Sequence, residues 1–551
     1  MVGSTSVEEA LSEGERALAR GAWAEAHGWF DAVLGRGEDP AALEGLSWVH
    51  WWQGDLERCL AARERAYREH RSAGDRRGAA RVALWIGDDH LWYRGSPALA
   101  EGWFARARRL LDGLAECPEH GWLAVFDAHV ALDGGDLDAA RTLAVEAQRL
   151  GRSHGVVGLE MFGVATEGMV RLEQGAHAAG LRCLDEATAA ALAGDYEDLA
   201  PAAWSCCLLL SACEQVRDDE RGAQWCPEIL AFSRRVGAEF LSGNCRSYHG
   251  SVLTRAGRWA EAEDELVAAA GQLAGGPATL HRDALARLGE LRGRQGRREE
   301  ARRSFEDAGE HWRAQAGLAT LRLAEGDAGG AAESVERALR QLPPETPRRA
   351  DALEVGVAVR LALADLDGAA GDTETLRRIA ERMPTRPLHA AALRCEARVA
   401  VASDDVHAAI RRYADAVATF ERSGAPFEAA QARLEMAAAL AAASRVRLAR
   451  EEARGAREAL EELGAASEAD RAASLLAALA GDEPASTSGP LTPRQIEVLR
   501  LAAEGHTERQ IAARLVLSEH TVHRHFANIY RRLGCASRAA AVSQASRLGV
   551  L

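Results

Sequence analysis

Apolar residues recur every three or four positions along almost the whole chain, with Ala, Glu and Arg between them. This spacing is typical of amphipathic α-helices, and no stretch alternates apolar and polar residues for long enough to predict a β-sheet. Only 15 of 551 residues are Pro, and the hydrophobic content of 47% is enough for a large core. The pattern therefore predicts an all-α protein.

Residues 8–480 repeat one unit, which is an apolar helix, a turn, and a second helix rich in Ala and charged residues. At the turns, Gly lets the chain reverse, an acidic residue favours the start of the next helix, and Ala permits close packing. Spacings of 30 to 43 residues separate the predicted turns, which lie at Gly21, Gly54, Gly95, Gly135, Gly175, Asp218, Gly257, Gly296, Gly326, Asp367, Asp404 and Ser444.

A period near 40 residues with two helices per unit indicates a helical solenoid, because one hairpin cannot bury its apolar face without a neighbour. Segments such as Gly21–Ala26 and Gly257–Ala262 resemble tetratricopeptide (TPR) repeats, in the longer bacterial form of MalT-like regulators. We expect about 12 hairpins over residues 1–480, stacked into a superhelix with a concave groove. Such grooves bind peptides, protein segments or small ligands, and the repeat does not say which.

The helical pattern stops at residues 481–490, GDEPASTSGP, which we interpret as a flexible linker. Residues 491–551 then carry the start and stop signals of four short helices. The predicted N-caps are Thr492, Thr507, Ser518 and Ser537, and the predicted helix ends are Gly505 and Gly534.

The third of these helices is expected to have two different faces. Its apolar face comprises Val522, Phe526, Ile529 and Leu533, and its opposite face comprises His520, Arg524, Ala527 and Arg531, flanked by His523 and Asn528. Arg can bond to guanine, Asn to adenine, and Ala can touch a thymine methyl group. A short helix lies about four residues before it, which is the spacing of a helix-turn-helix.

Charge separates this segment from the rest of the chain. Residues 491–551 contain nine Arg, no Lys and four Glu, which gives a net charge of +5. Since the whole chain has a net charge of −15, the rest of the chain has a net charge of −20. Only the C-terminal segment has the sign that duplex DNA attracts. The contrast also suggests that acidic repeats dock on the basic segment and hold it off DNA.

The segment resembles the LuxR-type (NarL/FixJ-type) DNA-binding domain at Leu491–Arg494, Val498-Leu499, Gly505, Ile511-Ala512, Leu515, Ser518, Thr521-Val522, His525, Asn528-Ile529, Leu533-Gly534 and Ser537-Arg538. The resemblance implies that the third helix enters the major groove and that helix 538–548 pairs two copies on an operator. Together with the face of the third helix, it predicts DNA contacts from Thr507, Arg509, Ser518, Thr521, His523, Arg524, Ala527, Asn528 and Arg531.

Four residues depart from the family pattern. Gln495 and Gln510 stand where the family commonly has Glu, Glu508 replaces a common Asn, and His523 a common Lys or Arg. Glu508 has the wrong sign for DNA, and His is mostly neutral near pH 7. These departures keep a second hypothesis open, a TPR scaffold whose terminal module does not read DNA.

Tryptophan is concentrated near the N-terminus, with nine of 13 Trp in the first 122 residues. Trp48, Trp51 and Trp52 share one predicted helical face. They form either an aromatic ligand pocket or part of the repeat packing, and the second interpretation is the more common one.

No motif predicts catalysis. The chain has no Lys, so it cannot contain a Walker A loop, and it lacks HExxH, GxSxG and dinucleotide-binding sequences. The ten Cys form no CxxC pair, and the pairs Asp218-Asp219 and Asp404-Asp405 suit helix caps. His520, His523 and His525 lack the spacing of a helical metal site. We expect no enzyme activity, metal or cofactor.

The N-terminus is polar and acidic, and no apolar run approaches the ~20 residues of a membrane span. The sequence thus predicts a cytoplasmic transcriptional regulator that acts as a dimer on duplex DNA and binds a ligand, peptide or protein through its repeats.

Overall fold

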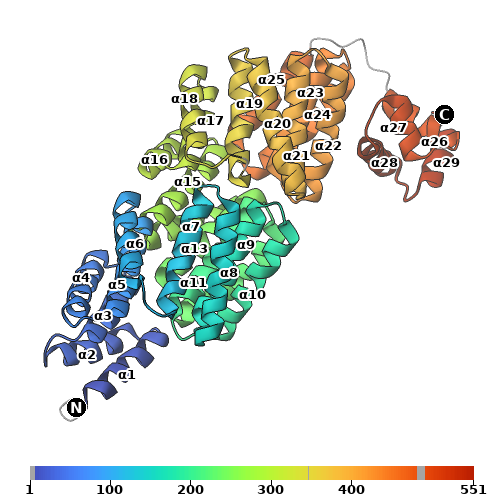
Figure 1. The fold of residues 1–551 in the computed structure, drawn as a ribbon. Helices are drawn as coiled ribbons and strands as arrows, with labels where there is room; N and C mark the ends of the chain where they lie inside the picture. Colours follow the sequence, from blue (N-terminus) through green and yellow to red (C-terminus); the bar gives the residue numbers. More distant parts are fainter. Residues whose placement is uncertain (1–5, 345, 481–490) are drawn as a thin grey trace. The chain divides into compact units, whose positions relative to one another are not determined.

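The computed structural model describes residues 6–344, 346–480 and 491–551, so the predicted linker at 481–490 lies outside the described residues. All regular structure in the described part is helical, with 29 α-helices, one 3-10 turn (Pro347–Arg349) and no strand (Figure 1). The expected all-α fold, TPR-like helical hairpins followed by a four-helix domain, is confirmed. Within this part of the chain, no helix is long and apolar enough to cross a membrane.

The chain divides into two compact units. The first contains Met1–Thr254, Arg258–Gly293 and Arg298–Ala352. Its helices are α1 (Val7–Ala19), α2 (Trp23–Leu34), α3 (Pro40–Trp52), α4 (Leu56–Ser72), α5 (Arg76–Trp92), α6 (Pro97–Leu111), α7 (Pro118–Asp133), α8 (Leu137–His154), α9 (Val157–Glu173), α10 (His177–Ala193), α11 (Leu199–Gln215), α12 (Asp219–Arg235), α13 (Glu239–Arg255), α14 (Trp259–Leu273), α15 (Ala278–Arg294), α16 (Arg298–Ala308), α17 (Trp312–Ala324) and α18 (Ala328–Arg340).

The second unit contains Arg255–Gly257, Arg294–Arg297 and Leu353–Leu551. It holds further repeat helices and the C-terminal helices, namely α19 (Ala350–Ala362), α20 (Leu366–Arg382), α21 (Arg386–Ala402), α22 (Val406–Arg422), α23 (Pro426–Ala442), α24 (Val446–Leu463), α25 (Ala466–Ala480), α26 (Pro493–Ala503), α27 (Glu508–Leu515), α28 (Glu519–Leu533) and α29 (Arg538–Arg547).

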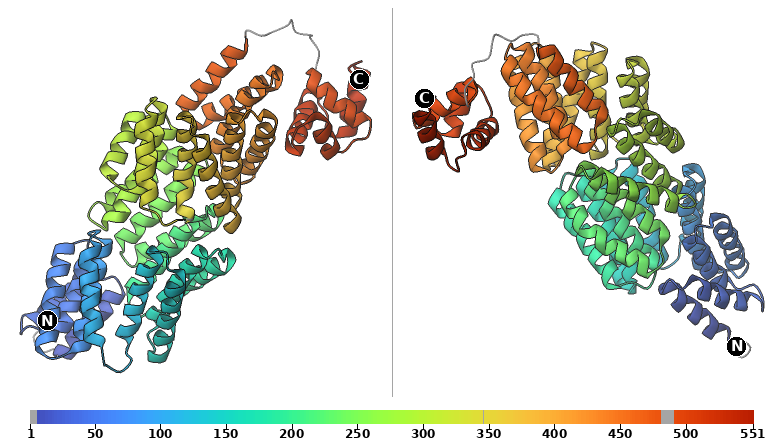
Figure 2. Two further views of the ribbon diagram at one scale, coloured as in Figure 1. Left: turned by 45° about the horizontal axis from the view of Figure 1, so that its top comes forward. Right: turned by 180° about the vertical axis from the view of Figure 1, so that it is seen from behind.

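The repeat helices pack as hairpins, as the views in Figure 2 show for α7 to α10 and for α21 to α24. Their turns need one residue in the left-handed region, and Gly supplies it at Gly135 (φ 81°) and Gly175 (φ 82°). Where Gly is absent, other residues take the strained conformation, and Arg217 and Ala364 have φ of 54° and 60°.

One predicted turn is wrong by a few residues. Asp367 lies inside the first turn of α20, and the chain reverses at Ala364 instead. Asp365, not Asp367, caps the helix, because its Oδ1 accepts a 2.9 Å hydrogen bond from the Gly368 amide. Two acidic residues two positions apart give equal capping signals, so the sequence did not distinguish them.

The two helices of a hairpin differ in burial. In α9, 12 of 17 residues are buried, whereas α10 buries six of 17, so α9 is enclosed by neighbours and α10 is amphipathic. Small residues let these helices approach closely, since a Cβ atom on Gly168 would lie 2.9 Å from the carbonyl oxygen of Gly180. The Ala- and Gly-rich composition therefore follows from the packing.

Buried ion pairs also join the repeats. Glu435 on α23 accepts hydrogen bonds from Arg394 (2.6 and 3.2 Å) and from Arg398 (2.7 and 3.1 Å), both on α21. Burial alone would raise the pKa of Glu435, but the two guanidinium groups hold that pKa well below its usual range.

We expect Glu435→Gln to lower the local stability of α21 and α23 by about 2 kcal/mol, because two partly buried arginines lose their common counter-charge. Hydrogen exchange of the amides in these helices measures the loss, and exposed Glu462→Gln is the control. The pKa of Glu435 is lowered on folding, so its stabilising effect is present above about pH 4.5 and is lost as the pH falls below it. A difference between variant and wild type that persisted unchanged in acid would contradict this assignment.

Candidate nucleic-acid interface and aromatic pocket

The four C-terminal helices enclose a hydrophobic core of their own. Leu499, Ile511, Val522, Phe526 and Ile529 are at most 1% exposed and form one cluster, whose other buried members also lie between residues 491 and 545. The apolar face predicted for α28 is therefore the face that packs inward.

Side chains fix where each of these helices begins. Thr492 and Thr507 form capping boxes, in which the hydroxyl accepts from the amide of Gln495 or Gln510 and the glutamine side chain accepts from the threonine amide. Ser518 and Ser537 accept from the amides of Thr521 and Ala540 at the starts of α28 and α29. All four predicted N-caps are confirmed, and the two glutamines take the place of the family's glutamates.

A short turn joins α27 to α28. Val516 follows the last residue of α27 with a left-handed φ of 53°, and the amide of Leu517 donates a 2.9 Å hydrogen bond to the carbonyl of Ala512. Val516 is β-branched, and such residues rarely adopt a left-handed backbone. The sequence therefore gave no indication of this turn residue. The turn sets α28 at an angle across α27, the arrangement of a helix-turn-helix (Figure 1).

The nine residues predicted to contact DNA divide into two groups. Five are exposed, and these are Thr507, Arg509, His523, Ala527 and Arg531. Four are half-buried, and these are Ser518, Thr521, Arg524 and Asn528. The side chain of Arg509 is 88% exposed and that of His523 is 73% exposed, so both are accessible to a large partner.

Acidic residues lie beside several of these side chains. Nδ1 of His523 is 3.4 Å from an oxygen of Glu508, so the two departures from the family pattern contact one another. Nε of Arg509 is 3.8 Å from Glu519, and a guanidinium nitrogen of Arg531 donates to Oδ1 of Asn528. The surface thus carries both charges, with an excess of arginine.

Two residues on the exposed face of α28 have partners that sequence reasoning missed. Nη1 of Arg524 donates a 2.9 Å hydrogen bond to Oε2 of Glu452 on α24, and Nε2 of His520 lies 3.0 Å from Oε2 of Glu421 on α22. Burial lowers the pKa of Arg524, but Glu452 more than offsets it and leaves the pKa raised. The paired residues lie far apart in the sequence, so the sequence could not predict the individual pairs. The acidic composition of the repeats was the one indication that such partners exist.

His525, on the side of α28 next to Arg524, is buried, with 3% of its surface exposed. Burial lowers the pKa of its imidazole to about 4, so the side chain is neutral at physiological pH. Its Nδ1 lies 4.0 Å from Glu451, beyond hydrogen-bonding distance. Its burial fits a packing role in this part of the structure.

The three tryptophans predicted to bind a ligand occupy different environments. Trp51 and Trp52 are buried, with 4% and 5% exposed, and Nε1 of Trp51 donates a 3.1 Å hydrogen bond to Asp89. Trp48 is half-buried, and its ring centroid lies 5.2 Å from that of Trp85. Of the three, Trp48 lines a cavity of about 340 Å³ that contains neither Trp51 nor Trp52 in its walls.

That cavity has a volume of about 340 Å³ and is lined by Trp48, Trp85, Trp122, Glu44, Arg81, Gly155, Val156, Gly158, Glu197, Asp198 and Pro201. Its polar side chains are held in place, since Nη2 of Arg81 donates a 2.7 Å hydrogen bond to Glu44 and Glu197 accepts from the amides of Val157 and Gly158. Burial raises the pKa of Asp198, whose Oδ1 caps α11. The walls thus combine indole surfaces with an excess of carboxylates.

The independent core, the tight turn and the arginine-bearing face of α28 together define a helix-turn-helix domain. Residues 489–545 match the family model described as GerE, bacterial regulatory proteins of the luxR family. The C-terminal domain is therefore a LuxR-family helix-turn-helix domain, and the resemblance stated from its motifs is confirmed.

Two curated relatives match short stretches of the chain. The HTH-type transcriptional regulator Mb0914c of Mycobacterium bovis is 44% identical over 66 residues, which are 12% of this chain and 8% of that protein. The quorum sensing-dependent regulator RpaR of Rhodopseudomonas palustris is 43% identical over 61 residues, 11% of this chain and 25% of that protein. The match thus spans under a tenth of the first relative's length and a quarter of the second's.

Solved structures show a distant likeness to the helical repeats. A Rap protein complexed with competence and sporulation factor has a TM-score of 0.44 at 12% identity, over 69% of this chain and 98% of that chain. The apo quorum sensor NprR of B. thuringiensis has a TM-score of 0.36 at 10% identity, with the same two coverages.

Ser518→Ala is expected to lower the stability of the first turn of α28 by about 1 kcal/mol, because the amide of Thr521 loses its hydrogen-bond acceptor. Hydrogen exchange at the amides of residues 519–522 measures this. Ser543→Ala, an exposed position within α29 that caps nothing, is the control and should leave those amides unchanged. Equal exchange in the two variants would show that the hydroxyl of Ser518 does not hold the helix start.

Proposed function

We propose that the protein is a sequence-specific, double-stranded DNA-binding transcriptional regulator. The observation that carries the proposal is α28, whose Val522, Phe526 and Ile529 are buried in a LuxR-family domain while Arg524, Ala527 and Arg531 lie on its other side. Arginine, histidine and asparagine on one face match the donor and acceptor groups of base edges in a major groove. The domain's net charge of +5 supplies the attraction to phosphates.

Within this proposal the contacts have separate tasks. Thr507, Arg509, Ser518 and Thr521 lie near the starts of α27 and α28 and bind phosphates, which fixes the register. His523, Arg524 and Ala527 meet base edges, and the neighbouring Asn528 and Arg531 extend the same surface. No catalytic step, metal or cofactor is part of the proposal.

We further propose that two copies pair through residues 538–548 on a two-fold operator. A single small module buries only about 600–1,000 Å² on DNA, so useful affinity requires two half-sites. Helix α29 supports this, because only Ala541 and Ala545 are buried while Ala539, Ala540 and Leu548 remain exposed. Small exposed residues allow a second copy of the helix to approach closely.

For the repeats we propose the binding of a regulatory ligand, peptide or protein, with the cavity at Trp48 as the site. Three indole rings and an excess of carboxylates favour an apolar ligand group that carries a positive charge. Trp51 and Trp52 then support the site from within the core. We place the protein in the cytoplasm, where a bacterial operator is accessible.

The alternative function is an interaction scaffold whose terminal module does not read DNA. The contact between Glu508 and His523 favours it, because a carboxylate on this surface repels phosphates. Selection of duplexes from a random pool by the full-length protein distinguishes the two functions, since only a DNA reader enriches a common sequence.

Arg524→Ala is expected to reduce the ratio of affinities for selected and unrelated duplexes by about 10- to 100-fold, because one base contact is lost. Arg509→Ala should weaken both duplexes alike and leave that ratio unchanged. Fluorescence anisotropy on both duplexes gives the ratio, which is independent of any contact that Arg524 makes in the free protein. Equal losses on the two duplexes for Arg524→Ala would contradict its assignment to base contact.

Trp48→Ala should abolish retention of the ligand, while Trp92→Ala, a change at an indole that is 41% exposed and outside the cavity, should not. The measurement is affinity selection of small molecules and peptides from an extract of the producing cells, read by mass spectrometry. Melting curves of both variants confirm that they are folded. Retention of the same compounds by Trp48→Ala and wild type would exclude this cavity as the site.

A further inference from the structure

Three carboxylates on the repeats lie against α28. Glu421 lies near the C-terminus of α22, and Glu451 and Glu452 are adjacent residues of α24. We call these three residues the acidic docking surface. They contact His520 at 3.0 Å, His525 at 4.0 Å and Arg524 at 2.9 Å, respectively.

Two carboxylates of the acidic docking surface share one arginine of the repeats. Within the repeats, Arg433 contacts Glu421 and lies 3.5 Å from Glu452, so one guanidinium serves two carboxylates. The side chain of Glu452 is only 7% exposed, and an acidic group at that depth requires a counter-charge. Arg524 provides it, and burial and the proximity of Arg524 lower the pKa of Arg433 in turn.

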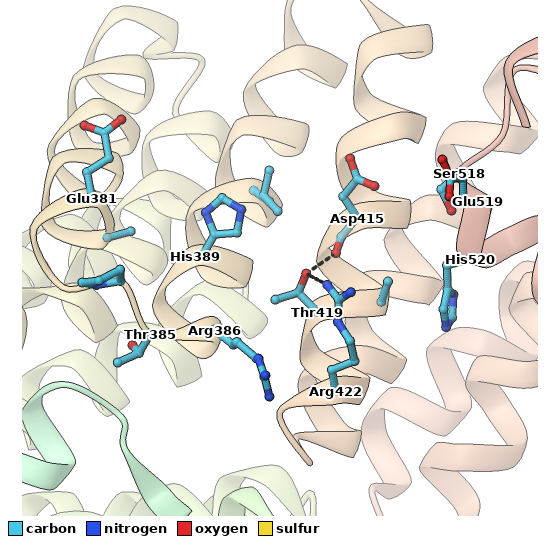
Figure 3. A pocket seen from close by; sticks show the side chains of 14 residues that line it. Glu381, Thr385, Arg386, His389, Asp415, Thr419, Arg422, Ser518, Glu519 and His520 are labelled. Atoms are coloured by element: carbon cyan, nitrogen blue, oxygen red, sulfur yellow. Dashed lines mark hydrogen bonds between the residues drawn. The ribbon is translucent and has the colours of Figure 1, made fainter. Parts of the chain in front are cut away.

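The contact is not sealed by apolar packing. Beside it lies a cavity of about 750 Å³, whose walls include Asp415, Thr419 and Arg422 of α22 and Ser518, Glu519 and His520 at the start of α28 (Figure 3). The core of the C-terminal domain contains no residue of the repeats. The ion pair between Arg524 and Glu452 is therefore the central contact of the attachment, which makes it reversible and sensitive to salt.

The same side chain cannot serve two partners. While Arg524 bonds to Glu452 it is unavailable to a base, and the carboxylates would repel the phosphates beside it. We propose that the acidic docking surface is an intramolecular binding site for the DNA-reading face of α28, and that the docked form does not bind DNA. The inference rests on the proposed function and identifies the residues through which the repeats control it.

The test compares full-length wild type, Glu452→Gln and Glu458→Gln. Glu458 lies on the same helix, is exposed and does not belong to the acidic docking surface, so its substitution makes the same change of charge without touching α28. One readout is the affinity for a duplex selected from a random pool and for an unrelated duplex. The other is hydrogen exchange of α28 and α24 in the absence of DNA.

Glu452→Gln is expected to bind both duplexes at least about fivefold more tightly than wild type, the lower end of usual coupling between sites. The gain should shrink as salt is raised, and exchange at the start of α28 should increase while Glu458→Gln behaves as wild type. Unchanged affinity and unchanged exchange in Glu452→Gln, or equal gains in both variants, would overturn the proposal.

Glu452→Gln also removes a neighbour of Arg433, so exchange in α24 reports whether the repeats themselves loosen. If they do, His520→Ala, which removes the partner of Glu421 on α28 and leaves both carboxylates of Arg433 in place, decides through the same two readouts. If no variant prefers any duplex, the proposed DNA reading fails. The exchange of α28 then still tests the docking independently.

Discussion

Close approach of helix backbones is the constraint on which the repeat architecture depends. A helical hairpin leaves one apolar face open, and only a neighbouring hairpin covers it. At Gly168 and Gly180 the helices approach so closely that a methyl group has no room. The many buried alanines have the same effect over the rest of the array.

This packing also explains the distribution of charge. A carboxylate paired with an arginine inside the array adds nothing to the net charge, so the −20 outside the C-terminal domain comes from the other carboxylates. Glu435 binds two guanidinium groups, and Asp89 binds the fully buried Arg63 at 2.9 Å. Arginine suits these places because it remains charged when buried and offers several donors in a fixed plane.

Much of the fold followed from local signals. Glycine marked most turns, and Ser or Thr marked the start of every helix in the C-terminal domain, because these residues meet local needs of the backbone. Turns at Arg217 and Ala364 gave no such signal, since tertiary packing imposes their left-handed backbone. The predicted faces of α28 were correct, but the pairing of Arg524 with Glu452 depends on residues 72 positions apart. The periodicity placed Trp48, Trp51 and Trp52 together, but could not show that Trp51 and Trp52 lie beneath the surface.

The capping boxes of α26 and α27 use Gln495 and Gln510, whose amides neither gain nor lose a proton between mild acid and mild base. A glutamate in either place would be a weaker acceptor once protonated, and at the exposed position of Gln510 its ionised form would add a negative charge beside residues proposed to meet a polyanion. The neutral version keeps both helix starts intact when the surroundings acidify.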